Sequence, residues 1–123
     1  MRPRGYSNGI VVPAGGKLIF VAGQIGWDPV TQQIVGDDFV AQTRQALQNV
    51  VTILAEAGAK PANIVRMTWY VLDKREYAAA ASHLGRAYRE VLGDHYPAMT
   101  LIEVQSLLED RARVEIEATA AIS

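Results

Sequence analysis

Alternation of apolar and polar residues marks five strand-like segments of the chain. Residues 17–25 and 64–72 are rich in β-branched and aromatic residues, which favour strands. The apolar run over residues 17–25 is almost continuous, and this predicts a strand that is buried on both faces. The expected strands are residues 6–12, 17–25, 64–72, 100–107 and 112–122.

Two further segments have apolar residues three or four positions apart, which is the spacing of an amphipathic helix. The first helix is expected to begin after one of the aspartates at residues 37–38, which caps it, and to end at Gly58. The second is expected to follow Asp73, because Glu76 stands three residues later in the spacing of a capping box. It should run as one helix to Gly93.

These elements follow the order ββαβαββ and predict one domain over residues 1–123, of the α+β class, with a mixed β-sheet. Each helix has a single apolar stripe, so the two helices should pack on one face of the sheet. A second subunit is the favoured cover for the other face, because small domains often gain stability by oligomerising. The alternative is a solvated face, which antiparallel sheets tolerate.

Composition and charge narrow the range of partners. Lysine plus arginine is 12 and aspartate plus glutamate is 13, so the chain lacks the cationic excess with which nucleic-acid binders displace counterions from phosphates. The absence of cysteine excludes thiolate catalysis, disulfides and cysteine metal sites. No apolar run approaches the roughly 20 residues of a membrane span, and the first residues lack the apolar stretch of a signal peptide. We expect a soluble, cytoplasmic protein with no nucleic-acid or membrane partner.

The last expected strand carries the strongest candidate for chemistry. Glu115 and Glu117 would share one of its faces, and Glu103 in the preceding strand could lie beside them. Carboxylates held close together repel one another, an arrangement that enzymes use for general acid–base work. Alternatively, an arginine pairs with these carboxylates and the face is merely charged. The arginines concerned are Arg66, Arg111 and Arg113.

Three positions depart from the pattern of their elements. Gly23 removes a side chain from a strand, which predicts a bulge or the close approach of a ligand or another backbone. Gly85 lies inside the second helix, where glycine costs about 1 kcal/mol relative to alanine; either the space is needed or the cost is tolerated. Met99 follows a proline corner at the mouth of a strand, where a ligand-binding group is typical, yet a thioether neither ionises nor donates a hydrogen bond.

Several short motifs occur in order along nearly the whole chain, and together they are specific. They are GYSNG, FVAGQI, QTRQALQNV, IVRMT, YPA, IEV and VEIEA, which begin at residues 5, 20, 42, 64, 96, 102 and 114. With these motifs the chain resembles the reactive intermediate deaminase family, also called Rid or YjgF. The resemblance implies a chorismate-mutase-like fold and a homotrimer whose sheets face inward, with small-molecule clefts between the subunits.

In the deaminating members that the chain resembles, these clefts hydrolyse enamines and imines to 2-keto acids and ammonia. The resemblance implies that neither a cofactor nor a metal is needed. It makes Glu115 the expected catalytic residue, because Glu115 matches the glutamate that positions or activates the attacking water. The expected substrate-binding residues are Tyr6, Gly23, Gln24, Gly85, Met99 and Leu101.

Met99 stands where the family has an arginine that binds the carboxylate of the substrate as a bidentate ion pair. Leu101 stands at a small or thiol position, and Gly85 at a position that is often asparagine. A charge-assisted pair contributes about 1.5–3 kcal/mol, so a simple 2-imino acid is expected to bind less tightly here.

Two functions from different classes follow. In the first, the protein is a hydrolytic deaminase with an altered substrate range, whose substrate has an apolar end near Met99 and Leu101. In the second, the cleft binds ligands without catalysis, and the trimer is a sensor, a carrier or a chaperone-like module. Glu115 favours the first and the missing arginine favours the second, unless another arginine replaces it; the candidates are Arg2, Arg4 and Arg111. Ribonuclease activity, which some family names carry, is disfavoured by the acidic balance.

Overall fold

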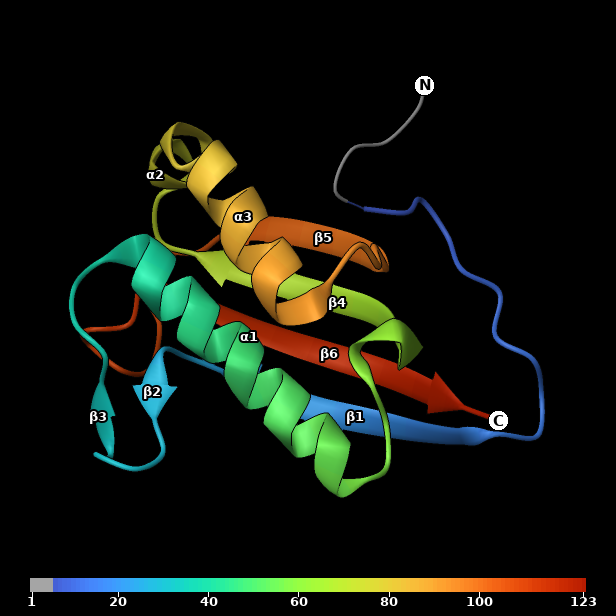
Figure 1. The fold of residues 1–123 in the computed structure, drawn as a ribbon. Helices are drawn as coiled ribbons and strands as arrows, with labels where there is room; N and C mark the ends of the chain where they lie inside the picture. Colours follow the sequence, from blue (N-terminus) through green and yellow to red (C-terminus); the bar gives the residue numbers. More distant parts are fainter. Residues whose placement is uncertain (1–5) are drawn as a thin grey trace.

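The structure is a computed structural model of the chain that describes residues 6–123. One four-stranded sheet has the strand order β1-β6-β4-β5, in which β4 and β5 are parallel and the other pairs are antiparallel (Figure 1). Its strands are β1 (Lys17–Gln24), β4 (Ile64–Val71), β5 (Ala98–Glu103) and β6 (Val114–Ile122). The predicted mixed sheet is confirmed, and a separate small hairpin is formed by β2 (Trp27–Asp28) and β3 (Gln33–Ile34).

The helices lie on one face of this sheet (Figure 1). They are α1 (Phe39–Glu56), α2 (Lys74–Ala79) and α3 (Ala81–Leu92), with a short 3-10 turn at Pro61–Asn63. The first helix is as predicted, because Asp38 caps it by accepting a hydrogen bond from the Ala41 N–H (2.8 Å) and Gly58 follows it at φ +80°. Within residues 6–123, no helix is long and apolar enough to cross a membrane.

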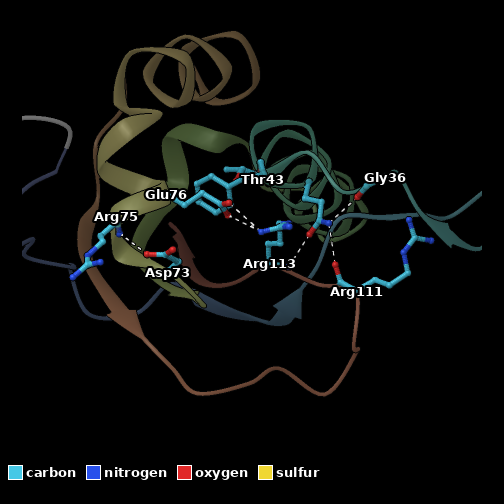
Figure 2. A network of polar contacts seen from close by, with 9 residues as sticks. Gly36, Thr43, Asp73, Arg75, Glu76, Arg111 and Arg113 are labelled. Atoms are coloured by element: carbon cyan, nitrogen blue, oxygen red, sulfur yellow. Dashed lines mark hydrogen bonds and ion pairs between the residues drawn. The ribbon is translucent and has the colours of Figure 1, made fainter.

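The second expected helix is in fact two, so residues 6–123 contain three α-helices where two were predicted. The break falls at Ala80, between α2 and α3. The expected capping box at Asp73 is also wrong. Asp73 accepts a hydrogen bond from the Arg75 N–H (2.8 Å), but Glu76 turns away and forms an ion pair with Arg113 (3.0 Å), as Figure 2 shows. A charged donor attracts the Glu76 carboxylate more strongly than a backbone amide does.

Residues 6–12 do not form the expected strand. Their only pairing within the described chain is a bridge from Ser7 to Ala98, where the Ser7 N–H donates to the Pro97 carbonyl (2.9 Å). This bridge ties the segment to β5 at one edge of the sheet, whereas β1 lies at the opposite edge. Residues 8–16 therefore have to cross the width of the sheet and cannot run alongside β1, so the order ββαβαββ is not observed (Figure 1).

The core fills the space between the helices and the sheet. Its largest fully buried side chains include Leu47, Leu54 and Met67. The prediction that β1 is buried on both faces is wrong for the single chain. Val21 is buried toward the helices, but Phe20 on the opposite face is 75% exposed. The sheet face away from the helices is open and carries large apolar side chains.

Candidate functional site

Glu115 lies on the open face of the sheet, directly over Gly23. Its neighbours Val114 and Ile116 are fully buried toward the helices, so the alternation of the strand turns Glu115 to the other side. A Cβ atom built on Gly23 would lie 1.9 Å from Oε2 of Glu115. The register of β1 against β6 shifts between Val21 and Gln24, which confirms the predicted irregularity at Gly23. Gly23 is the residue that leaves room for the Glu115 carboxylate.

The other carboxylates have separate partners. Glu117 accepts a hydrogen bond from the Tyr70 hydroxyl (2.7 Å), and this bond, with burial and the charge of Glu117, raises the pKa of Tyr70. Glu103 pairs in register with Val71, whose side chain is in the core, and its carboxylate accepts the Lys74 N–H (2.9 Å). Glu103 therefore does not join Glu115 and Glu117, contrary to the prediction.

The arginines near β6 do not neutralise Glu115. Arg113 pairs with Glu76 (3.0 Å) and Arg111 pairs with Asp37 (3.3 Å), and both pairs are partly exposed. In the described part of the chain, no ion pair includes Glu115. The prediction that Arg111 replaces the missing arginine gains no support in the single chain, and Arg2 and Arg4 lie outside the described residues.

Gln42 on α1 fixes the loop that leads into β6. Its Nε2 donates to the carbonyls of Gly36 (2.7 Å) and Arg111 (3.0 Å), and its Oε1 accepts the Arg113 N–H (2.8 Å). Figure 2 shows the dashed lines of these contacts at Gly36, Arg111 and Arg113. The side chain is fully buried, and its position sets where β6 begins and hence where Glu115 lies. Sequence reasoning missed this residue; the available signal was a polar side chain three residues after Phe39 on the apolar stripe.

Met99 lies on the helix side of the sheet. It pairs in register with the buried Met67, and it lines a pocket of about 320 Å³ between α3 and the strands β4 and β5. Gly85 on α3 lines the same pocket. Leu101 pairs in register with Trp69 and packs against the core. These three predicted site residues thus gather on one side, close to the β5 edge.

Hydrogen bonds hold the corner that precedes Met99. The Tyr88 hydroxyl donates to the His95 carbonyl (2.5 Å), and burial raises the pKa of Tyr88. The His95 ring Nε2 contacts the Ile64 carbonyl (2.6 Å), which gives this histidine a structural role. Ser7 Oγ donates to the Tyr96 carbonyl (2.6 Å), so Tyr6, which precedes Ser7, lies near the corner.

The predicted site residues therefore form two groups rather than one. Glu115, Gly23 and Gln24 lie toward the β1 edge, where the two β1 residues also line a pocket of about 340 Å³. The group around Met99 lies toward the β5 edge, on the opposite face from Glu115. One small molecule cannot contact both groups of the same chain. Within residues 6–123, no three His, Asp or Glu side chains cluster as a metal site.

Comparison with known proteins identifies the family. Residues 2–122 match the family model described as Endoribonuclease L-PSP. A RutC family protein of Pyrococcus abyssi is 39% identical over 115 residues, which cover 94% of this chain and 84% of that protein. A crystal structure of a Rid-family protein from Yersinia pestis matches with a TM-score of 0.80 and 36% identity over 96% of this chain and 87% of that one.

This chain belongs to the Rid/YjgF family. The family resemblance read from the motifs is thereby confirmed, as is a YjgF-type fold with a mixed sheet. Rid relatives include a 2-iminobutanoate/2-iminopropanoate deaminase of Salmonella typhimurium, which is 36% identical over 85% of this chain and 80% of that protein.

Proposed function

We propose that this Rid-family chain is a hydrolase of imines or enamines that needs no cofactor, with Glu115 as its acid–base residue. The observation that carries the proposal is the Glu115 carboxylate seated on Gly23, on an open face and without an ion pair among the described residues. A carboxylate that is not neutralised by an arginine is available to take a proton from water. The deaminase relatives support this reaction class.

The chemistry requires one proton acceptor that later becomes a donor. Glu115 would take a proton from water as the water oxygen bonds to the C=N carbon, and would give that proton to the imine nitrogen to form a carbinolamine. Glu115 would then take the hydroxyl proton of the carbinolamine as the C=O bond forms and pass it to the nitrogen, which leaves as ammonia when the C–N bond breaks. Imine and water are thereby converted to a carbonyl compound and ammonia, and no other reactant is consumed.

The arrangement of the two residue groups supports an assembly of several copies. Strands β1 and β5 are the two edges of the sheet, and each group lies toward one of them. A head-to-tail contact would bring the Met99 pocket of one copy to the Glu115 face of the next, and contacts of this kind form a ring when the rotation between copies closes. The family resemblance implies a ring of three copies, and we propose this number. The exposed Phe20 and Leu18 would then be covered inside the ring.

A ligand-binding protein without catalysis is the second candidate. The observation that favours it is the pocket at Met99, whose walls are mainly aromatic and apolar and which lies away from Glu115 in the chain. Ligand binding there would not require Glu115. A ribonuclease is not proposed, because a net charge of −1 offers little to phosphate groups.

Imine hydrolysis by the wild-type protein tests the proposal. Imines are generated in place from leucine, methionine and phenylalanine by an amino-acid oxidase, and semicarbazide competes with the protein for them. We expect the wild type to divert the imines from semicarbazide, and to sediment as a trimer. Failure to hydrolyse any of these imines would favour the ligand-binding candidate, and a monomer at assay concentration would contradict the shared cleft.

Gly23→Ala tests whether the position of the Glu115 carboxylate matters for activity, because it moves this group without changing its chemical nature. Gly23 does not have a positive φ, so alanine fits the backbone and the change acts through its Cβ, which would push the Glu115 carboxylate away. Displacing a catalytic group by about 1 Å can cost about 100-fold, so we expect a loss of tenfold to 100-fold in kcat/KM. Gly9→Ala is the matched control, because a Cβ at Gly9 meets nothing within 4 Å. Equal activity of the two variants would contradict the claim that Gly23 leaves the space in which the Glu115 carboxylate is positioned for catalysis.

A further inference from the structure

The pocket beside Met99 has one cationic side chain among its lining residues. It lies where α3 crosses β4 and β5 (Figure 1), and its volume of about 320 Å³ suits a small organic ligand. The lining residues that bear on ligand chemistry are Trp69, Tyr77, Tyr88, Tyr96, Met99 and Arg89. The aromatic rings and the thioether favour an apolar body, and the guanidinium of Arg89 favours an anionic group.

Gly85 makes room for Arg89. The two residues are one turn apart on α3, so they lie on the same face of the helix. A Cβ atom at Gly85 would lie 3.3 Å from Nη1 of Arg89, and apart from the helix's own backbone and the two adjoining residues no other atom lies within 4 Å of it. The guanidinium therefore lies over the bare backbone of Gly85, beside the pocket. Glycine costs about 1 kcal/mol relative to alanine inside a helix, and here it lets the guanidinium approach the helix backbone without meeting a methyl group.

The guanidinium of Arg89 is uncommitted. No ion pair or side-chain hydrogen bond among residues 6–123 involves the exposed Arg89, and it shares this with Arg66, Arg75 and Arg86, but of these four only Arg89 lines the pocket. The indole Nε1 of Trp69 is a second unpartnered donor, since it is buried and has no acceptor among the described residues. A buried donor without a partner is costly, so oxygen atoms of a bound ligand would satisfy it.

We propose that Arg89 binds the carboxylate of a small acid whose aromatic or large apolar body fills this pocket, and thereby replaces the arginine that is absent at Met99. This proposal identifies the substrate as a 2-imino acid with a large apolar side chain, and that identification rests on the proposed function. The binding step itself does not depend on catalysis. Its direct consequence is that an unreactive acid of this class binds through Arg89.

The test measures binding of 3-phenylpropionate and of its neutral amide, 3-phenylpropionamide, by NMR titration of the full chain. We expect the acid to bind the wild type more tightly than the amide does. Arg89→Gln should weaken binding of the acid roughly tenfold or more, the effect of losing a charge-assisted hydrogen bond, and should leave the amide unchanged. Arg89→Lys should give an intermediate loss, because lysine keeps the charge without the bidentate fork.

Arg86→Gln is the matched control, because Arg86 is an exposed arginine of the same helix that does not line the pocket. Three results would each overturn the proposal. The acid could bind equally well to wild type and to Arg89→Gln, Arg86→Gln could weaken binding as much as Arg89→Gln does, or the wild type could fail to bind the acid. The outcome is independent of hydrolysis. If the protein binds the acid through Arg89 but does not hydrolyse imines, the role of Arg89 stands and the proposed function is contradicted. If it hydrolyses imines but does not bind the acid through Arg89, the proposed function stands and the role of Arg89 is contradicted.

Discussion

Replacing Glu115 by glutamine is expected to lower kcat/KM for imine hydrolysis by about 100-fold to 10,000-fold, the usual contribution of a positioned acid–base group. Glutamine has nearly the same shape as glutamate, so its side chain still fits over Gly23. It cannot accept and return a proton at neutral pH, so the loss should appear in kcat rather than in KM. Stopped assays of 2-keto acid formation at saturating and limiting substrate distinguish the two parameters.

Glu56→Gln provides the control for this prediction, because Glu56 is exposed at the end of α1. The control should keep the wild-type activity, and both variants should unfold at the wild-type temperature. An active Glu115→Gln variant would remove Glu115 from the mechanism. The water would then have to be activated by another group on the open face.

Replacing Gln42 by leucine should cause a large loss of stability. Leucine has a similar volume but cannot form hydrogen bonds. The carbonyls of Gly36 and Arg111 and the N–H of Arg113 would each lose the partner that Gln42 provides. A buried group left without a partner costs about 1–3 kcal/mol, and some of these groups will find water, so we expect a decrease of about 2–5 kcal/mol in the free energy of unfolding. That is a large part of the roughly 5–15 kcal/mol that stabilises a typical domain.

Urea unfolding followed by circular dichroism measures this change. Gln48→Leu is the matched control, because Gln48 is an exposed glutamine of the same helix, and its unfolding free energy should stay within about 0.5 kcal/mol of wild type. If both variants unfold alike, the contacts of Gln42 contribute little, and the loop before β6 is held by other interactions.

The parts of the fold that could be predicted depend on residues close together in the sequence. The helix α1 has its cap, its apolar stripe and its terminal glycine within one segment, so its bounds follow from local chemistry. The expected strand at residues 6–12 failed because Ser7 pairs with Ala98, a contact between distant parts of the chain. Glu76 failed as a capping residue for the same reason, since Arg113 is 37 positions away.

In the candidate site, too, single residues could be predicted from local sequence, whereas contacts between distant segments could not. Glu115 and Gly23 were each predicted from their own strands, but the contact between them depends on the pairing of β1 with β6. Arg89 was missed, although one signal was present: a glycine inside a helix, four residues before an arginine. Only the structure shows that the guanidinium occupies the space that this glycine leaves.

The separation of the two residue groups to opposite edges of one sheet has a genetic consequence. In the proposed ring, every site would take Glu115 from one copy and the Met99 pocket from the next. Two alleles that damage different groups would each be inactive alone, yet mixed rings made in the same cell would contain some intact sites. Mutations that damage the same group would never complement one another, so crosses between alleles would reveal which residues work together across the boundary between copies.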